Sequence, residues 1–387
     1  MFLRWNSFSF SLLSGLTFWL LSLSFLGLVL FIFGTHLATL TLTHLAKGML
    51  TFIFVLTLLL LLLASLQVYL HVISRKRTEK YQSKKHWYAV WSAVLYGGQA
   101  APKTTDPNAK KALLDIAANL SDDYHETLLG IYEQTYLWKD LSVLESRRPA
   151  EVKSVYVESL AIIRQPLAIK HLYKAAHSKS SELRHLALLA LAKTCERTEL
   201  SRAQLELLFL SLFNSGKFSK GVMEEVLMAL ADKAELLIPC LLSRSNHLAV
   251  RIAALNAIAY KQNAQYLPYC LKPLDDPHPD IRAAALRALH GINFVPPEAY
   301  PALLKSLKDP LPFIRNQAVK ACRGVLDTAI NNHLLLALGD EDWWVRFNAA
   351  ETLSQRGQAA LEKLERAARV HPDPYARDIV GHVLSLA

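Results

Sequence analysis

The residue types that most often carry chemistry occur in this chain, but their spacing favours neither a catalytic site nor a metal site. His171, His177 and His185 follow one another at intervals of six and eight residues, so a helix would not bring all three to one face. The sequence contains no glycine-rich phosphate loop, no GxSxG nucleophile elbow and no HExxH metal motif. We therefore expect that the protein is not an enzyme and that it has no catalytic residue, bound metal or cofactor.

The four cysteines also point to a structural role. They are widely spaced and form no CxxC pair, at Cys195, Cys240, Cys270 and Cys322. This pattern argues against a zinc knuckle or a redox motif, and it fits reduced, buried thiols in a cytosolic domain.

A more informative pattern is an aspartate that precedes an arginine by six residues. The stretch "LDDPHPDIRAAALRAL" contains Asp276 and Arg282, and the pair returns as Asp309 with Arg315 and as Asp340 with Arg346. The arginines of the full series, which are 31, 33, 31 and 31 residues apart, are Arg251, Arg282, Arg315, Arg346 and Arg377. A mostly small apolar residue follows each arginine by three and by six positions, which predicts a helix face packed closely on a neighbour.

In such a series the turns recur at the same place, so the charged pairs can repeat from unit to unit. An aspartate at the turn can cap the second helix of its unit and accept a hydrogen bond from the arginine of its own or the adjacent unit. We interpret these residues as a structural ladder that sets the register between units. Its members are Asp276, Arg282, Asp309, Arg315, Asp340 and Arg346.

With this pattern of aspartate, apolar residue, arginine and alanine, residues 245–387 resemble HEAT repeats, in particular the short variety also called phycobilisome-lyase-like HEAT repeats. The resemblance is weaker over residues 150–244. It implies an all-α protein in which pairs of antiparallel helices stack into a right-handed α-α superhelix, a HEAT/armadillo-like solenoid. Departures from the pattern are Ser178, Ser245 and His371 in the place of the aspartate, and Met223 or Lys220 in the place of an arginine.

The amino-terminal part is apolar enough to cross a membrane. No charged residue lies between Trp5 and Ala46, and a second run without charge extends from Gly48 to Ser74. Since a span needs about 20 apolar residues, we predict transmembrane helices near Ser9–Phe33 and Met49–Ile73, forming a hairpin within residues 1–74. A cleaved signal peptide is the alternative for the first run, although its apolar core exceeds the roughly 7 to 15 residues of such peptides.

A cluster of cations follows the second run and sets the expected orientation. By the positive-inside rule, both termini lie in the cytoplasm and the protein is a multi-pass protein of the inner (plasma) membrane. The cations, which we expect to contact lipid headgroups, are Arg75, Lys76, Arg77, Lys80, Lys84 and Lys85. The adjacent Trp87, Tyr88 and Trp91 are either interfacial anchors or the start of the soluble core.

The charge balance of residues 101–387 differs from that of the amino-terminal part. Residues 1–100 hold eight Lys and Arg and one acid, which leaves 43 − 8 = 35 basic and 33 − 1 = 32 acidic residues for residues 101–387. This near balance argues against nucleic acid as a partner. We expect a basic juxtamembrane segment and linker over residues 75–106, a helix capped by Asp106 before Pro107, and the repeat solenoid over residues 107–387.

A solenoid of this kind offers its concave face to a partner. The stretch "DEDWWVRF" adds two adjacent indoles, for which we favour packing of both against the neighbouring unit, with exposure of one as an interface anchor as the alternative. Candidate partner-binding residues are Asn256, Arg287, Asn316, Gln317, Lys320, Trp343, Phe347, Asn348 and Glu351.

These observations favour a non-enzymatic, membrane-anchored scaffold that binds a protein partner through its concave face. A membrane transport complex or an envelope polysaccharide complex would suit such an accessory subunit. An enzyme or enzyme subunit related to the bilin lyases is the alternative, because some proteins that the chain resembles attach chromophores. A nucleic-acid tether is a third interpretation, which predicts binding that falls steeply with salt.

Overall fold

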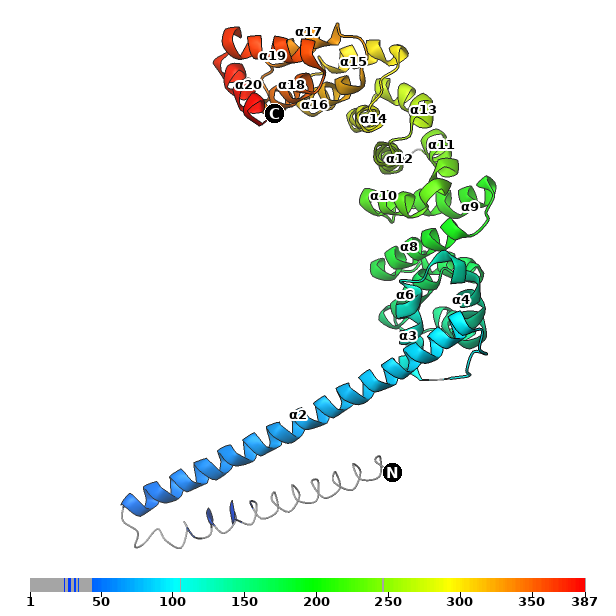
Figure 1. The fold of residues 1–387 in the computed structure, drawn as a ribbon, viewed down its shortest axis with the longest axis vertical. Coiled ribbons are helices and arrows are strands. Elements are labelled where there is room, and N and C mark those ends of the chain that lie inside the picture. Colours follow the sequence, from blue (N-terminus) through cyan, green and yellow to red (C-terminus); the bar gives the residue numbers. More distant parts are fainter. Residues whose placement is uncertain are drawn as a thin grey trace. The chain divides into compact units, whose positions relative to one another are not determined.

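The structure is a computed structural model of the 387-residue chain, and every regular element in its described part is helical (Figure 1). It describes residues 44–104, 106–245 and 247–386, together with Ser24, Gly27, Leu28, Phe31, Ile32 and Gly34. The chain divides into two compact units, Met1–Leu113 and Leu114–Ala387. The predicted first span, Ser9–Phe33, lies largely outside the described residues.

The first unit is dominated by one long helix, α2 (His44–Gly97), of 54 residues. Thr51–Gly97 is long and apolar enough to cross a membrane, and none of its most apolar window is buried. Because residues 49–96 contain neither proline nor glycine, the helix continues through the basic cluster. The irregular connection begins only at Gly98, which has a positive φ of 64°.

The helix α3 (Pro107–Ala117) begins as the sequence predicts. Asp106 caps it, since its Oδ1 accepts a hydrogen bond from the Asn108 backbone N–H (2.8 Å). Its Oδ2 also accepts from the indole of Trp87 (2.7 Å). Trp91 is fully buried and its indole donates to the Ala109 carbonyl (2.8 Å), which places this residue in the folded core rather than at a membrane interface.

The second unit is a row of helix pairs. It opens with α4 (His125–Tyr132), a π-helical segment (Glu133–Leu137), α5 (Trp138–Glu145) and α6 (Ala150–Ile163). The pairs that follow are α7 (Ile169–Ala175) with α8 (Ser181–Arg197), α9 (Arg202–Phe213) with α10 (Lys220–Ala229), α11 (Ala234–Arg244) with α12 (Leu248–Lys261), α13 (Leu267–Leu271) with α14 (Pro279–Ile292), α15 (Tyr300–Ser306) with α16 (Pro312–Ala321), α17 (Ile330–Ala337) with α18 (Trp343–Ser354), and α19 (Gln358–Val370) with α20 (Pro374–Leu386). Short 3-10 helices lie at Asp122–Tyr124, Pro166–Ala168, Ala231–Lys233, Ala264–Tyr266, Lys272–Asp275, Pro297–Ala299 and Cys322–Gly324.

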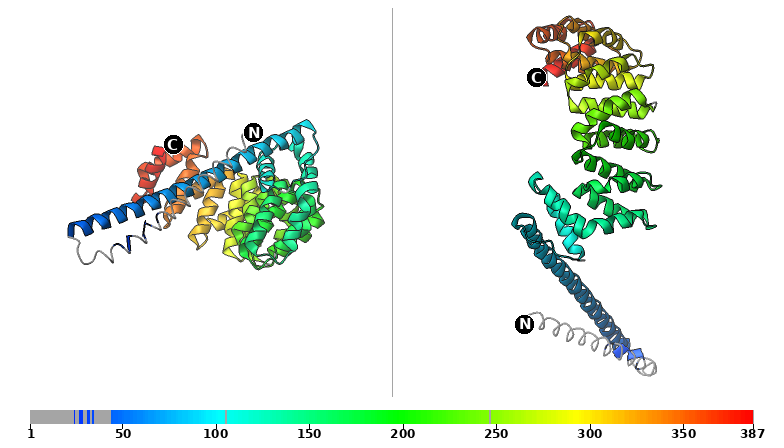
Figure 2. Two further views of the ribbon diagram at one scale, coloured as in Figure 1. Left: turned by 90° about the horizontal axis from the view of Figure 1, so that it is seen from below. Right: turned by 90° about the vertical axis from the view of Figure 1, so that its right-hand side faces the viewer.

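The second helices of the pairs pack on one another in sequence order, from α6 through α8, α10, α12, α14, α16 and α18 to α20. Figure 1 shows α8, α10, α12 and α14 on the inner side of the curve of this unit and α9, α11 and α13 on the outer side. The stacked layers are visible edge-on in Figure 2. The predicted all-α solenoid is confirmed for this unit, and α10 is the helix in which Met223 takes the place of an arginine.

Small buried residues allow the second helices to approach closely. The positions three and six residues after each arginine are all buried, as predicted, at Ala254, Ala257, Ala285, Ala288, Ala318, Ala321, Ala349, Thr352, Val380 and Val383. The helices lie especially close at Gly291 of α14, where a Cβ atom would lie 2.3 Å from the Ala259 carbonyl oxygen of α12. The atoms that approach there belong to the backbone of both helices, so a change of side-chain rotamer could not make room for a methyl group.

We therefore expect Gly291→Ala to lower the free energy of unfolding by about 1–3 kcal/mol, because the added methyl group separates α12 from α14. Gly381→Ala in α20 is the matched control, since no atom lies within 4 Å of its Cβ position. That substitution should be neutral or stabilise by about 0.5–1 kcal/mol. Urea unfolding of the two full-length variants measures both effects, and equal midpoints would show that the close contact does not limit packing.

Candidate binding surface

Each ladder arginine joins two neighbouring units. It is the fourth residue of its second helix, and its guanidinium pairs with the aspartate that precedes the second helix of the next unit. The N–O distances are 2.6 Å for Arg251 with Asp276, 2.8 Å for Arg282 with Asp309, 2.8 Å for Arg315 with Asp340 and 3.1 Å for Arg346 with Asp373. Of the two partners considered from the sequence, the adjacent unit supplies the carboxylate.

The same guanidinium also holds the turn of its own unit. Arg282 donates to the Asp276 carbonyl oxygen (3.1 Å) and Arg315 to that of Asp309 (3.0 Å). Arg346 donates in the same way to the carbonyl oxygen of Asp340. One side chain therefore fixes a turn within its own unit and a contact to the next.

The aspartate closes the turn before the helix rather than bonding to the first helical turn. The Asp276 carboxylate accepts from the backbone N–H of His278 (2.9 Å), two residues later. Burial alone would raise the pKa of Asp276, but this bond and the Arg251 guanidinium hold that pKa below its ordinary value of 3.8. The stabilisation from this pair is thus present at neutral pH and lost as the pH falls through the lowered pKa.

Residues that replace the aspartate keep the turn but change the ladder. Ser245 accepts from the backbone N–H of His247 (3.2 Å) and donates to the amide oxygen of Asn214 (2.6 Å). His371 accepts from the backbone N–H of Asp373 (3.2 Å), and the Asp373 carboxylate pairs with Arg346 instead. Met223 is the fourth residue of α10 and is buried, so its unit places an apolar side chain where others have arginine.

Removing one ladder carboxylate should cost far more stability than removing an exposed one. Arg315 and Asp340 have side chains that are 9% and 12% exposed, so Asp340→Ala should lower the free energy of unfolding by about 3 kcal/mol. Asp275→Ala is the control, because the pair of Asp275 with Lys305 is 60% and 75% exposed and is worth less than about 1 kcal/mol. Asp340→Asn should fall between them, since an amide oxygen can still accept from the Asp342 backbone N–H. Similar urea midpoints for both alanine variants would contradict this assignment.

Several residues that we expected to face a partner instead form hydrogen bonds within the array. Asn256 and Asn348 are 5% and 4% exposed, which corrects their assignment to a contact surface. The side-chain amide of Asn256 bonds to Glu224 and Arg287, and that of Asn348 donates to Asn316 (2.8 Å). These polar groups bridge adjacent second helices, and burial requires that they be paired. Gln317 and Lys320 are half-buried and Glu351 is exposed.

The two indoles of α18 are both exposed, which corrects the expectation that both pack against the neighbouring unit. Trp343 is 49% and Trp344 is 59% exposed, because they occupy the first turn of α18, directly after its capping residue Asp342. The Trp343 ring stacks on Phe347, with centroids 5.1 Å apart, and meets Trp344 edge-on at 4.7 Å. These rings form a compact aromatic cluster.

The cluster belongs to a longer series that the sequence analysis did not find. Phe313, Trp344 and Tyr375 are each the second residue of a second helix, in α16, α18 and α20, and they are 43%, 59% and 68% exposed. We refer to these three residues as the aromatic row. The equivalent positions in α8, α10, α12 and α14 hold Glu182, Gly221, Ala249 and Asp280. The sequence does show this series, because the three aromatic residues lie two positions before Arg315, Arg346 and Arg377.

The predicted lipid-binding cations all lie on α2. Lys76, Arg77, Lys80 and Lys84 fall within about 100° of one another around the helix axis, and Lys85 points to another side. Arg75 pairs with Glu79 at 2.9 Å, in an exposed bridge between residues four apart.

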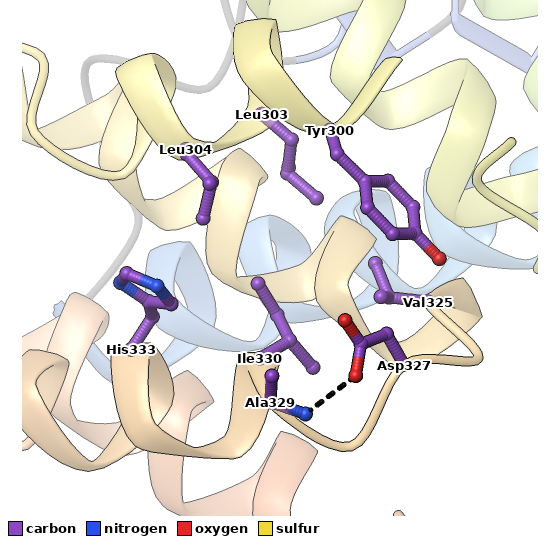
Figure 3. Close-up of a pocket in the computed structure, with 8 residues that line it drawn as sticks. All are labelled: Tyr300, Leu303, Leu304, Val325, Asp327, Ala329, Ile330 and His333. Carbon is purple, nitrogen blue, oxygen red and sulfur yellow. Dashed lines mark hydrogen bonds between the residues drawn. The ribbon is translucent and has the colours of Figure 1, made fainter. Parts of the chain in front are cut away.

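Among the described residues, no group of three or more His, Cys, Asp or Glu side chains could hold a metal ion. One pocket, of about 80 Å³, lies between α15 and α17. Figure 3 shows the imidazole of His333 and the carboxylate of Asp327 at opposite ends of it, with Ile330 between them. Asp327 accepts from the Ala329 backbone N–H (2.8 Å), so this carboxylate supports the loop before α17.

The four cysteines are free and buried, as predicted. Burial raises the pKa of the Cys195, Cys270 and Cys322 thiols to about 12. Burial also raises the pKa of the Cys240 thiol. These side chains are therefore protonated and unreactive at neutral pH.

Comparison with known proteins gives a family match for the carboxy-terminal part. Residues 234–323 and 301–385 match HEAT repeats. Among solved structures, the chain is similar to YibA of Escherichia coli (14% identity over 74% of this chain and 99% of that one, TM-score 0.38) and to Kap95p in its complex with RanGDP (11% identity over 76% and 47%, TM-score 0.44). It is also similar to a designed armadillo repeat protein (16% identity over 57% and 99%, TM-score 0.30).

None of these three likenesses reaches a TM-score of 0.5, so none of them informs the function of this chain. No curated protein matches it in sequence. The family match and the stacked helix pairs together support HEAT-like repeats over residues 234–385.

Proposed function

We propose that this protein is a membrane-anchored scaffold that binds a protein partner on its HEAT array at the cytoplasmic face of the inner membrane. The observation that carries the proposal is the aromatic row, formed by Phe313, Trp344 and Tyr375. Arrays of HEAT repeats commonly serve as interaction scaffolds. An accessory role in a membrane transport complex or an envelope polysaccharide complex fits this arrangement.

The aromatic row has the composition of a binding surface. Large aromatic side chains are enriched at the energetic centres of protein interfaces, because they bury much area for little loss of conformational entropy. Equivalent positions in adjacent stacked units place the three rings along one edge of the second helices. Trp343 and Phe347 widen this edge at its middle unit.

The row is also held rigidly. Its units contain the ladder pairs of Arg315 with Asp340 and Arg346 with Asp373. The Arg346 guanidinium also lies over the ring of Tyr375, 5.8 Å from its centroid, which orients this exposed side chain. A surface that is ordered before binding loses less entropy when a partner docks.

Membrane attachment rests on α2. Its apolar half is exposed over a length that suits a bilayer, and the cations that follow would meet the negatively charged headgroups. The Phe31 ring stacks on Phe54 of α2, with centroids 5.0 Å apart, which supports a hairpin formed with the preceding apolar run. Attachment would raise the local concentration of the array near a membrane-bound partner without any added contact.

A photo-crosslinking residue at position 344 tests the partner surface in intact membranes. We expect a discrete adduct with one protein, and Tyr375→Ala should reduce its yield about tenfold, as expected for loss of an interface anchor. The control carries the crosslinker at Leu207 in α9, which is 75% exposed but lies outside the aromatic row. The same adducts from both positions, or yields that Tyr375→Ala leaves unchanged, would exclude the row as the docking site.

Orientation can be tested with a single exposed thiol. Because the native cysteines are buried and protonated, a Lys80→Cys variant should be the one position that a membrane-impermeant maleimide labels in the folded protein. We expect labelling only after the inner membrane is opened, since the positive-inside rule places residue 80 in the cytoplasm. Labelling in cells with an intact inner membrane would show the opposite orientation. Recovery of the chain in the soluble fraction would contradict the membrane anchor.

A further inference from the structure

A second pocket lies at the start of the repeat row, well away in sequence from the aromatic row. It has a volume of about 180 Å³ and is bounded by α5, α6, α7 and the first turn of α8. Its polar lining consists of Glu145, Lys153, His171, Lys174 and Ser178, and Leu144, Ala175 and Leu183 complete it. Neither the scaffold function nor the lipid contact involves these residues.

The pocket occupies the place of a ladder pair. Lys153 is the fourth residue of α6, the position that holds arginine in α12, α14, α16, α18 and α20. Ser178 follows it by 25 residues, the separation of Arg251 from Asp276 and of Arg315 from Asp340. Ser178 also closes its turn as the aspartates do, because its hydroxyl accepts from the backbone N–H of Ser180 (3.2 Å). This unit therefore keeps the cation and the turn of the ladder but lacks the carboxylate.

The charges of the pocket are unbalanced. Among the described residues, no carboxylate lies within ion-pairing distance of the Lys153 or the Lys174 ammonium group. The acid that lines the pocket, Glu145, lies 3.4 Å from Nε2 of His171. The other ring nitrogen of His171, Nδ1, is buried and has no hydrogen-bond partner in the described part of the chain.

We propose that this pocket binds a phosphate group, as free phosphate or as a small phosphate monoester, which replaces the missing ladder carboxylate. Lys153, Lys174, Ser178 and His171 line the pocket, and their side chains carry groups that can donate to a phosphate oxygen. Phosphate has more acceptor oxygens and more charge than a carboxylate, and lysine is a common phosphate ligand. The bound group would link α6 to the turn before α8, as Asp276 links α12 to the turn before α14.

Thermal unfolding of the full chain in a neutral detergent tests this site. Inorganic phosphate and glycerol 3-phosphate are titrated separately against sodium chloride at equal ionic strength, and at least one should raise the unfolding midpoint in a saturable way. A rise with phosphate alone identifies the free ion, and a rise with glycerol 3-phosphate alone identifies an ester. No rise with either, relative to chloride, would overturn the proposal.

Two variants assign the effect to the pocket. Lys153→Met should weaken the apparent affinity about tenfold or more, because it removes one charge-assisted contact. Lys305→Met, at an exposed lysine of another unit, should leave the affinity unchanged. Ser178→Asp supplies the missing carboxylate in ladder register, so it should raise the midpoint without phosphate and abolish the phosphate-dependent rise. Unchanged titrations in both Lys153→Met and Ser178→Asp would place the phosphate effect elsewhere and reject this pocket.

Discussion

In the units of Arg282, Arg315 and Arg346, the guanidinium of the arginine makes two kinds of contact. It donates to a carbonyl oxygen of the turn in its own unit and pairs with a carboxylate of the next. Arginine suits this position because its planar guanidinium group has five N–H donors and stays positively charged at any physiological pH. Since each unit alone buries too little apolar surface to fold, the array depends on correct register between neighbours, and the ladder enforces that register at every contact from Arg251 to Asp373.

The ladder works together with close packing. The residues three and six positions after each arginine are mostly small, so the second helices approach until the backbone of Gly291 lies against that of Ala259. At this distance a shift of one residue along a helix would place larger side chains in the contact. The charged pair specifies the register and the small residues make any other register costly, which is how a short sequence pattern determines a long array.

The array could be predicted from sequence because these two constraints act locally and repeat. The spacing of the arginines predicted the second helices, and the small residues after them predicted the buried face. Whether each arginine pairs with the aspartate of its own unit or of the next unit could not be predicted. The answer depends on the distance between stacked units, which the spacing along the chain does not give. Asn256 and Asn348 were misplaced for a related reason: each faces the neighbouring helix, so an amide that appears solvent-facing within one unit is buried by the next.

The amino-terminal unit was predicted less completely. Hydropathy identified the apolar part of α2, but not that the helix would continue through its basic cluster to Gly97. Residues 76–85 are mostly Lys, Arg, Glu and Gln, which are good helix formers, and no glycine or proline follows them before the pair Gly97 and Gly98. The aromatic row was missed because Trp343 and Trp344 were considered within their own unit, whereas exposed rings recur two residues before Arg315, Arg346 and Arg377. The assignment to the short, lyase-type HEAT subtype stays a prediction.

The two candidate sites in this protein relate to the repeat pattern in opposite ways. The position two residues before the arginine holds Glu182, Gly221, Ala249 and Asp280 in earlier units, so neither the ladder nor the packing determines it. Three successive units nevertheless hold Phe313, Trp344 and Tyr375 there, although exposing these rings to water is unfavourable. Ser178 is the opposite case, since it occupies a position that the ladder does constrain and leaves a cation without its carboxylate. Exposed rings in the first case and an unpaired cation in the second are both unfavourable and are not required by the fold. Binding of a partner or a ligand would offset each of these costs.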